Sequence, residues 1–257
     1  MRAKRVDLRV VSSHLSSTGG FLTRQLLPRR HTALLVAMVA MFATRPVIGD
    51  LRFGPIVFSI ALIVLMMVSI YTIQVDELIG EREALVARKR RQSKIGWLLA
   101  IPAVADRLVV AFVPIPSVVR AGLFFWLIFF VYITWNELRG IVRQKEVTGE
   151  TISMSVSVYL LMALTWAFLY HLLYSVQPQA FSFGSSPAPN SLSQTFPVFL
   201  YFSLTTISTI GFGDITPLTL QARYAAVAEG ITGQFYLAIL VARLVALHMV
   251  KPSSRDT

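Results

Sequence analysis

The chain has 257 residues, of which 55% are hydrophobic and only 14% are charged, and its mean hydropathy is +0.64. Apolar runs of this length and number are typical of an integral membrane protein and exclude an ordinary soluble domain. The net charge of +11 does not indicate a nucleic-acid partner, because the basic residues gather between the apolar runs. The chain has no cysteine, so disulfides, zinc thiolate sites and thiol chemistry are excluded.

The hydropathy pattern divides the chain into a basic, serine-rich N-terminal tail at residues 1–30 and a series of apolar segments. No cleaved signal peptide is expected in this tail. Six segments are expected to span the membrane, at residues 31–48, 53–73, 95–113, 118–135, 155–175 and 218–250. The first is the weakest, because its strictly apolar part covers only residues 33–43. A seventh stretch, at 196–208, is too short to cross and predicts a short helix that re-enters the membrane.

Basic residues predict the orientation of these segments. The N-terminal tail carries seven Lys or Arg residues and the loop after the second segment carries six, whereas residues 176–208 carry none. Both termini are therefore expected in the cytoplasm, and the loop before the last segment outside. We expect an integral protein of a bacterial inner membrane, with anionic lipids as partners of its basic cytoplasmic loops.

Residues 205–214 read Thr-Thr-Ile-Ser-Thr-Ile-Gly-Phe-Gly-Asp. To aim successive carbonyl groups at one axis, a chain must alternate between ordinary and left-handed backbone, which glycine adopts without steric cost at Gly211 and Gly213. The alternative is an ordinary Gly-Phe-Gly turn, which the position between two long apolar segments disfavours. The segment Thr209-Ile210-Gly211-Phe212-Gly213 resembles the Thr-Val-Gly-Tyr-Gly filter of potassium channels.

This resemblance implies a two-helix pore domain at residues 155–250, contributed by each of four identical chains. The fold class is then an all-α integral membrane protein with six transmembrane helices, a re-entrant pore helix and a selectivity-filter loop. The remaining parts are a four-helix transmembrane domain at 31–135, a cytoplasmic linker at 136–154 and a short cytoplasmic tail at 251–257. The expected function is passive, potassium-selective conduction through a homotetramer, without enzymatic activity or a cofactor. Oxygens of Thr209, Ile210, Gly211 and Phe212 would bind the permeant potassium ion.

The same resemblance suggests supporting residues around the filter. Tyr201 and Phe202 lie where the family has aromatic residues that brace the filter, and Phe212 replaces the usual tyrosine. Thr205 stands where some relatives have a glutamate, so the usual carboxyl bond to Asp214 is not expected. Tyr201 is then the expected partner of Asp214, and an apolar cuff is expected to replace the usual hydrogen-bonded one.

In the last segment, two glycines and one carboxylate stand out. Gly230 is expected at a close approach to the pore helix and Gly233 at a gating hinge, although both glycines also fit tight helix packing. Glu229 is explained either by a hydrogen bond to pore-helix hydroxyls such as Thr206 or Ser208, or by a role in attracting ions. The residues expected to face the cavity or lower pore are Gln234, Leu237 and Val241.

The first four segments resemble the layout of voltage-gated channels but lack their charges. A sensor needs several arginines at every third position, and the fourth segment carries Arg120 alone. Strong voltage dependence is therefore not expected. Asp106 and Arg107 are intramembrane charges that would pair with each other or with Arg120.

Two other classes of function stay open at this point. One is a subunit of a potassium uptake system, but such systems carry four degenerate filter repeats in one chain and this chain has one. The other is a non-conducting or accessory membrane subunit, for which a complete filter sequence would be unnecessary.

Overall fold

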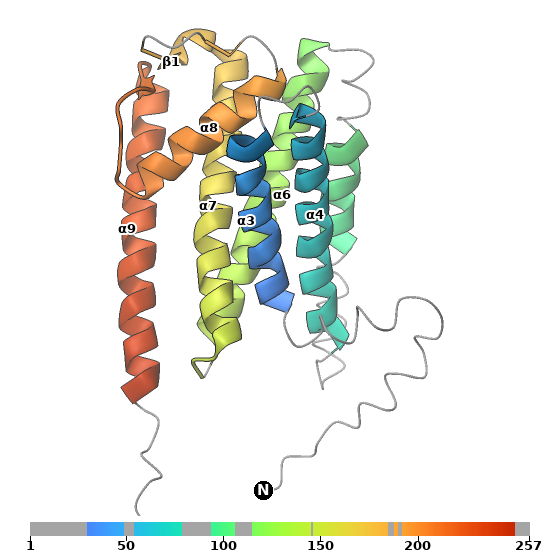
Figure 1. Ribbon diagram of the computed structural model, residues 1–257, viewed down its shortest axis with the longest axis vertical. Coiled ribbons are helices and arrows are strands. Elements are labelled where there is room, and N and C mark those ends of the chain that lie inside the picture. The colour runs from blue at the N-terminus through green and yellow to red at the C-terminus, as the bar shows by residue number, and fades with distance from the viewer. Residues whose placement is uncertain are drawn as a thin grey trace, which may run out of the picture.

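The computed structural model describes residues 30–48, 54–78, 94–105, 115–144, 146–184, 188–189 and 192–249. These residues are mostly helical (Figure 1). The helices are α3 (Arg30–Ile48), α4 (Gly54–Leu78), α6 (Pro116–Arg143), α7 (Gly149–Val176), α8 (Leu192–Ile207) and α9 (Leu220–Met249), with a further helical segment at Lys94–Ala105. Two short strands, β1 (Phe181–Ser182) and β2 (Thr216–Pro217), pair antiparallel.

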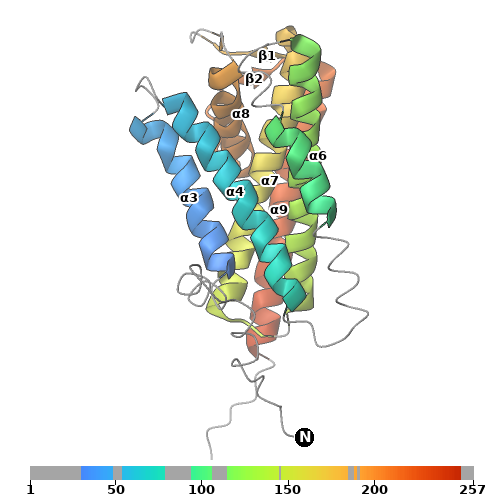
Figure 2. The ribbon, with the colours of Figure 1, turned by 90° about the vertical axis from the view of Figure 1, so that its right-hand side faces the viewer.

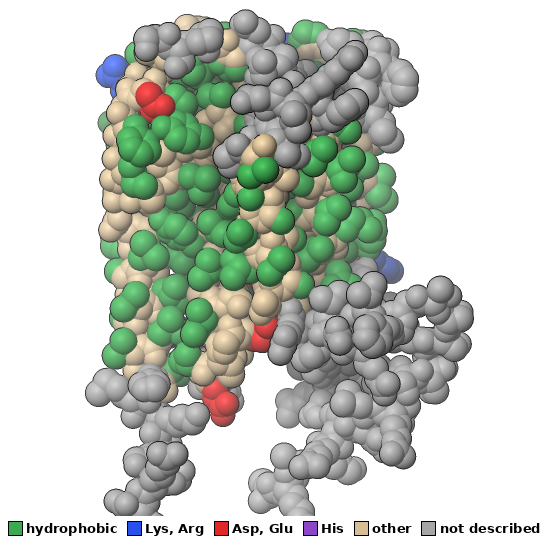
Figure 3. All heavy atoms as spheres, viewed as in Figure 1, with side chains coloured by type: hydrophobic (Ala, Val, Ile, Leu, Met, Phe, Trp, Pro, Cys, Tyr) green, Lys and Arg blue, Asp and Glu red, His purple; other side chains and the backbone are tan. Residues whose placement is uncertain are grey.

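Four of the described helices are long and apolar enough to cross a membrane, namely α4, α6, α7 and α9. The apolar parts of α3 and of the segment Lys94–Ala105 are shorter, and residues 106–113 of the expected third span lie outside the described residues. Hydrophobic side chains cover the middle of the face drawn in Figure 3, and the acidic side chains in view lie near its two ends. The protein is therefore a mostly α-helical integral membrane protein, as its composition predicts.

The two helices around the expected 136–154 linker are longer than the hydropathy pattern predicts. Helix α6 continues to Arg143 and α7 begins at Gly149, so only residues 144–148 connect them. The hydroxyl of Thr148 accepts a bond from the amide of Thr151 (3.2 Å), and the Thr151 hydroxyl accepts one from the amide of Thr148 (3.3 Å). Because this reciprocal cap satisfies amides that have no partner inside the helix, it decides where α7 starts.

Helix α7 is the centre of the packing. It contacts α3 and α6 on one side and α8 and α9 on the other, as the two ribbon views show (Figures 1 and 2). The fully buried ring of Phe168 in α7 stacks on Trp126 and Phe130 of α6, with ring centroids 5.6 Å and 5.2 Å away. The same ring lies 4.3 Å from that of Phe196 in α8. One side chain thus joins three helices.

Helix α9 lies at the edge of the molecule, beyond α7 and α8 (Figure 1). Of an 18-residue stretch of α9 that is apolar enough to cross a membrane, only 6% is buried within the chain. Large apolar side chains are exposed along it: Tyr224, Val227, Ile231, Phe235, Leu237, Ile239, Val241 and Val245. The chain's own described elements therefore leave most of this helix uncovered.

We expect the substitution Phe168→Ala to lower the free energy of unfolding by on the order of 3 kcal/mol, because it leaves a cavity where three helices meet. The measurement is thermal and denaturant unfolding in detergent, followed by circular dichroism. Phe124→Ala is the matched control, since Phe124 of α6 is 51% exposed and its loss opens no cavity in the core. Equal losses for the two variants would contradict this account of the packing.

Candidate functional site

The loop at residues 209–213 starts directly at the C-terminal end of α8. The amides of Ile210 and Gly211 both donate to the carbonyl oxygen of Thr205, at 2.9 Å and 3.1 Å, and the Thr209 amide donates to that of Thr206 at 3.0 Å. These bonds fix the start of the loop against the last helical turn. Because a helix C-terminus carries about half a negative charge, this position also favours a nearby cation.

The backbone of this loop alternates in handedness. Thr209, Gly211 and Gly213 have φ angles of 61°, 53° and 78°, whereas the intervening Ile210 and Phe212 are not in the positive-φ region. Alternating backbone of this kind turns successive carbonyl groups toward the same side of the chain. Thr209 is the one non-glycine residue at positive φ in the described part of the chain, and strained backbone of this kind is found mainly at functional sites.

Around the loop, Tyr201 of α8 makes two contacts. Its ring stacks on that of Phe212, with centroids 6.3 Å apart and planes within 2°. Its hydroxyl forms a hydrogen bond with the carboxyl group of Asp214. The pairing of Tyr201 with Asp214 is the one that the sequence suggests, and it holds the segment after the loop beside α8.

The strands complete the support of the loop on its far side. Phe181 pairs with Pro217 and Ser182 with Thr216, and the Leu218 amide donates to the carbonyl of Ala180 at 2.8 Å. The end of α7 is thereby tied to the segment that leads from the loop into α9. Both ends of the 209–213 loop are consequently attached to α7 or α8.

Two of the suggested supporting residues face away from the loop. Phe202 is buried and packs against Tyr170 and Phe181, with ring centroids 5.0 Å and 5.6 Å away, so within the chain it does not brace Phe212. The Thr205 hydroxyl donates to the carbonyl of Phe202 at 2.9 Å. Thr205 therefore contributes to the loop through its backbone carbonyl and not through its side chain.

The two glycines of α9 differ in how closely they approach α8. A Cβ at Gly233 would lie 2.6 Å from Cγ1 and 2.8 Å from the carbonyl oxygen of Ile207, the last residue of α8. A Cβ at Gly230 would meet no atom within 4 Å. The prediction of a close approach at Gly230 is thus wrong within this chain, because the rotation of α9 turns Gly233 toward α8 instead.

The remaining candidates of α9 divide between its buried and exposed sides. Gln234, Leu237 and Val241 are exposed, on the part of α9 that the chain leaves uncovered. Glu229 is fully buried and bonds to Tyr170 and Ser203. The expected bond to a hydroxyl of the helix before the loop is present, but the partner is Ser203 and not Thr206 or Ser208. The Ser208 hydroxyl instead donates to the carbonyl of Leu204 at 2.6 Å.

The intramembrane charges of the first four segments are placed only in part. Asp106 and Arg107 lie outside the described residues, so their predicted pairing stays a prediction. Arg120 is the fifth residue of α6, and its Nε donates to the carbonyl of Pro116 at 3.2 Å. In α9, Arg243 donates from Nη2 to the carbonyls of Val142 and Gln144, both at 2.8 Å.

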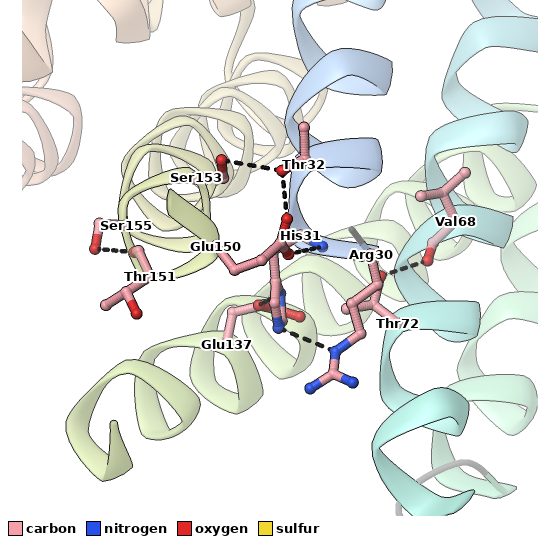
Figure 4. A network of polar contacts seen from close by, with 10 residues as sticks. All are labelled: Arg30, His31, Thr32, Val68, Thr72, Glu137, Glu150, Thr151, Ser153 and Ser155. Atoms are coloured by element: carbon pink, nitrogen blue, oxygen red, sulfur yellow. Dashed lines mark hydrogen bonds and ion pairs between the residues drawn. The ribbon is translucent and has the colours of Figure 1, made fainter. Parts of the chain in front are cut away.

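The structure also contains a buried polar cluster that the sequence reasoning missed (Figure 4). His31 Nδ1 of α3 lies 3.2 Å from Glu137 Oε2 of α6, and both side chains are almost fully buried. The His31 amide donates to Glu150 Oε2 of α7 at 3.0 Å, and the Thr32 hydroxyl donates to the other oxygen of the same carboxylate. The cluster was missed because the polarity of Glu137 and Glu150 placed both in a linker, and only the longer helices bring them together.

We expect Gly233→Ala to reduce stability by about 1–3 kcal/mol, because its Cβ overlaps a backbone oxygen that cannot move independently of α8. Gly230→Ala is the matched control, since the chain leaves room for its Cβ and alanine favours a helix by up to about 1 kcal/mol. Unfolding in detergent, followed by circular dichroism, compares the two. A larger loss for Gly230→Ala would show that the rotation of α9 differs from the one described.

Comparison with known proteins assigns the class of this site. Residues 158–249 match a family described as "Ion channel". Over 100 residues the chain is 32% identical to Protein LctB of Bacillus caldotenax, covering 37% of this chain and 71% of that protein. It is 29% identical over 96 residues to Protein LctB of Geobacillus stearothermophilus, with the same coverage. None of the solved structures matches the chain.

The chain therefore belongs to this ion channel family. The matched residues contain α8, the 209–213 loop, all of α9 and the part of α7 from residue 158 to its end. This confirms the coarser part of the expectation, an ion channel in a membrane, and points to a function that is not enzymatic.

Proposed function

We propose that the protein is a potassium-selective channel that conducts passively through a pore formed by four copies of the chain. The observation that carries the proposal is the alternating backbone of Thr209, Gly211 and Gly213 at the negative end of α8. Carbonyl oxygens turned to one side are what a dehydrated potassium ion needs in place of its water shell. In this proposal the ion binds at oxygens of Thr209, Ile210, Gly211 and Phe212.

The proposed architecture has six membrane spans and one re-entrant helix. The spans are α3, α4, the helix that begins at Lys94, α6, α7 and α9, and α8 is the re-entrant element. In Figure 1, α8 starts at the end of the bundle where α7 ends, slants part of the way toward the other end, and the chain then returns. Backbone without regular structure at this depth is tolerable only where it is buried in protein or lines a water-filled path, and the proposed pore supplies the second.

A tetramer is proposed because one loop cannot surround an ion. The exposed face of α9 supports this, since the described residues of the same chain leave its large apolar side chains uncovered. The side chains of Ile210 and Phe212 are also 58% and 68% exposed in the single chain. Association of the chains around an axis at the 209–213 loop would cover these surfaces and place Gln234, Leu237 and Val241 toward the lower pore.

The proposed channel is not strongly voltage-gated. The basic residues of α6 are Arg120, its fifth residue, and Arg139 and Arg143 in its last two turns, so no arginine lies in its middle. A charge that crosses 100 mV contributes only about 2.3 kcal/mol, and a steep response needs several such charges.

Anionic lipids are further proposed partners. They would bind at the basic loops on the inner side of a bacterial inner membrane, with both chain ends in the cytoplasm.

We expect reversal potentials of the purified protein in liposomes to show a strong preference for potassium over sodium. Gly213→Ala should abolish conduction or selectivity, because its Cβ at a φ of 78° introduces strain of about 1–2 kcal/mol in each chain. Asp214→Asn, at the adjacent and exposed position, is the matched control and should have a milder effect. Equal permeability of the wild type to both ions would rule out the proposal.

Native mass spectrometry in detergent should give four copies of the 28.6 kDa chain. The physical reason is that the filter loop of one chain supplies only one side of an ion site. Wild-type protein from the flux measurements serves as the sample, so that mass and conduction are compared on the same preparation. A monomer or dimer as the conducting species would be incompatible with the proposed pore.

A further inference from the structure

Three buried oxygen–oxygen contacts connect α7, α8 and α9 behind the 209–213 loop. Tyr170 Oη lies 2.6 Å from Glu229 Oε2, and Ser203 Oγ lies 2.7 Å from the carbonyl oxygen of Ala163. The third contact joins Ser203 Oγ to Glu229 Oε1. Tyr170, Ser203 and Glu229 are all fully buried, so water does not replace any of these contacts.

The number of hydrogens available for these contacts indicates the protonation state of the Glu229 carboxyl group. Each of the three contacts needs one hydrogen between its two oxygens, because two bare oxygens at such distances repel each other. Tyr170 and Ser203 supply one hydrogen each, and the Ala163 carbonyl supplies none. The single hydrogen of Ser203 is therefore needed for the contact with Ala163. The hydrogen between Ser203 and Glu229 then has to come from Glu229. The carboxyl group is then protonated on Oε1 and accepts from Tyr170 on Oε2.

The surroundings of Glu229 fit a neutral carboxyl group. The titratable groups near it are Tyr170 and Tyr159, both of α7, and the group that faces it from α8 is the hydroxyl of Ser203. In the part of the chain that the structure describes, no basic side chain pairs with it. An unpaired carboxylate in a membrane helix is costly, whereas a neutral acid with both oxygens bonded is not.

The position of Ser203 gives this contact chain a functional consequence. Ser203 lies in α8 two residues before Thr205, whose carbonyl holds the start of the 209–213 loop. The contacts thus fix the depth of α8 against both α7 and α9, close to the point where the loop is attached. A shift of α8 along its axis would displace the Thr205 carbonyl and with it the loop.

We propose that Glu229 is a neutral carboxylic acid that positions α8, and through it the ion-binding loop, by donating to Ser203 while accepting from Tyr170. The effect of Glu229 on conduction rests on the proposed channel function, but the protonation of Glu229 does not. Glu229→Gln reproduces both bonds, because the amide donates to Ser203 and its carbonyl accepts from Tyr170. Glu229→Ala removes both, and Ser203→Ala removes the donor–acceptor link to α8.

Infrared difference spectra of wild type against Glu229→Gln test the protonation. At neutral pH the wild type should show the carbonyl stretching band of a protonated carboxylic acid that the variant lacks. An ionised carboxylate band in its place would overturn the proposal. This measurement needs folded protein only and does not depend on which ion is conducted.

Potassium flux and selectivity in liposomes test the positioning. Glu229→Gln should conduct as the wild type does, while Glu229→Ala and Ser203→Ala should lose flux or selectivity with the oligomer intact on native mass spectrometry. If Glu229→Gln fails as severely as Glu229→Ala, the neutral positioning role is wrong. If the wild type conducts no potassium, the proposed function fails, and the infrared band still decides the state of Glu229. Ser203→Ala keeps the comparison decisive should Glu229→Ala not fold.

Discussion

The carbonyl oxygen of Thr205 is the point on which the 209–213 loop depends. It accepts the amides of both Ile210 and Gly211, so the alternating backbone begins at a fixed place instead of continuing as helix. Backbone amides that are shielded from water need a partner within the protein, and this one carbonyl oxygen serves two of them. The placement of α8 is therefore as important as the sequence of the loop itself, and much of the remaining packing serves to fix α8.

Hydroxyl groups that bond to backbone carbonyls of neighbouring helices do much of this fixing. Tyr159 of α7 donates to the carbonyl of Ile207 at 2.9 Å, and Tyr236 of α9 donates to that of Ser155 at 2.7 Å. In a membrane the hydrophobic effect gives little preference for one helix contact over another, so polar contacts and close packing define the register. The approach of Gly233 to Ile207 is the packing counterpart of these bonds.

The sequence predicts well what depends on local pattern. Hydropathy locates the main helices, and the resemblance of residues 209–213 to a filter predicts left-handed backbone at Gly211 and Gly213. The positive φ of Thr209 was not predicted. The rotation of one helix against another is not local, which is why Gly233 and not Gly230 approaches α8 and why Ser203 and not Thr206 bonds to Glu229. The ends of α6 and α7 differ from the expected span ends for another reason, since polarity does not reveal that a cap at Thr148 starts α7.

The short connection between α6 and α7 and the contacts of Arg243 join the first four helices to the last one. Only residues 144–148 separate α6 from α7, and the two helices pack along each other. Arg243 of α9 donates to the carbonyls of Val142 and Gln144, at the C-terminal end of α6 where helix carbonyls have no partners and the helix dipole favours a cation. A tilt of α6 would therefore move these acceptors and pull on the end of α9 that lies farthest from the loop. Nearer the loop, α9 is held by the bonds of Glu229 and by the close contact of Gly233 with Ile207. Arg243 holds the part of α9 that lies farther from the loop.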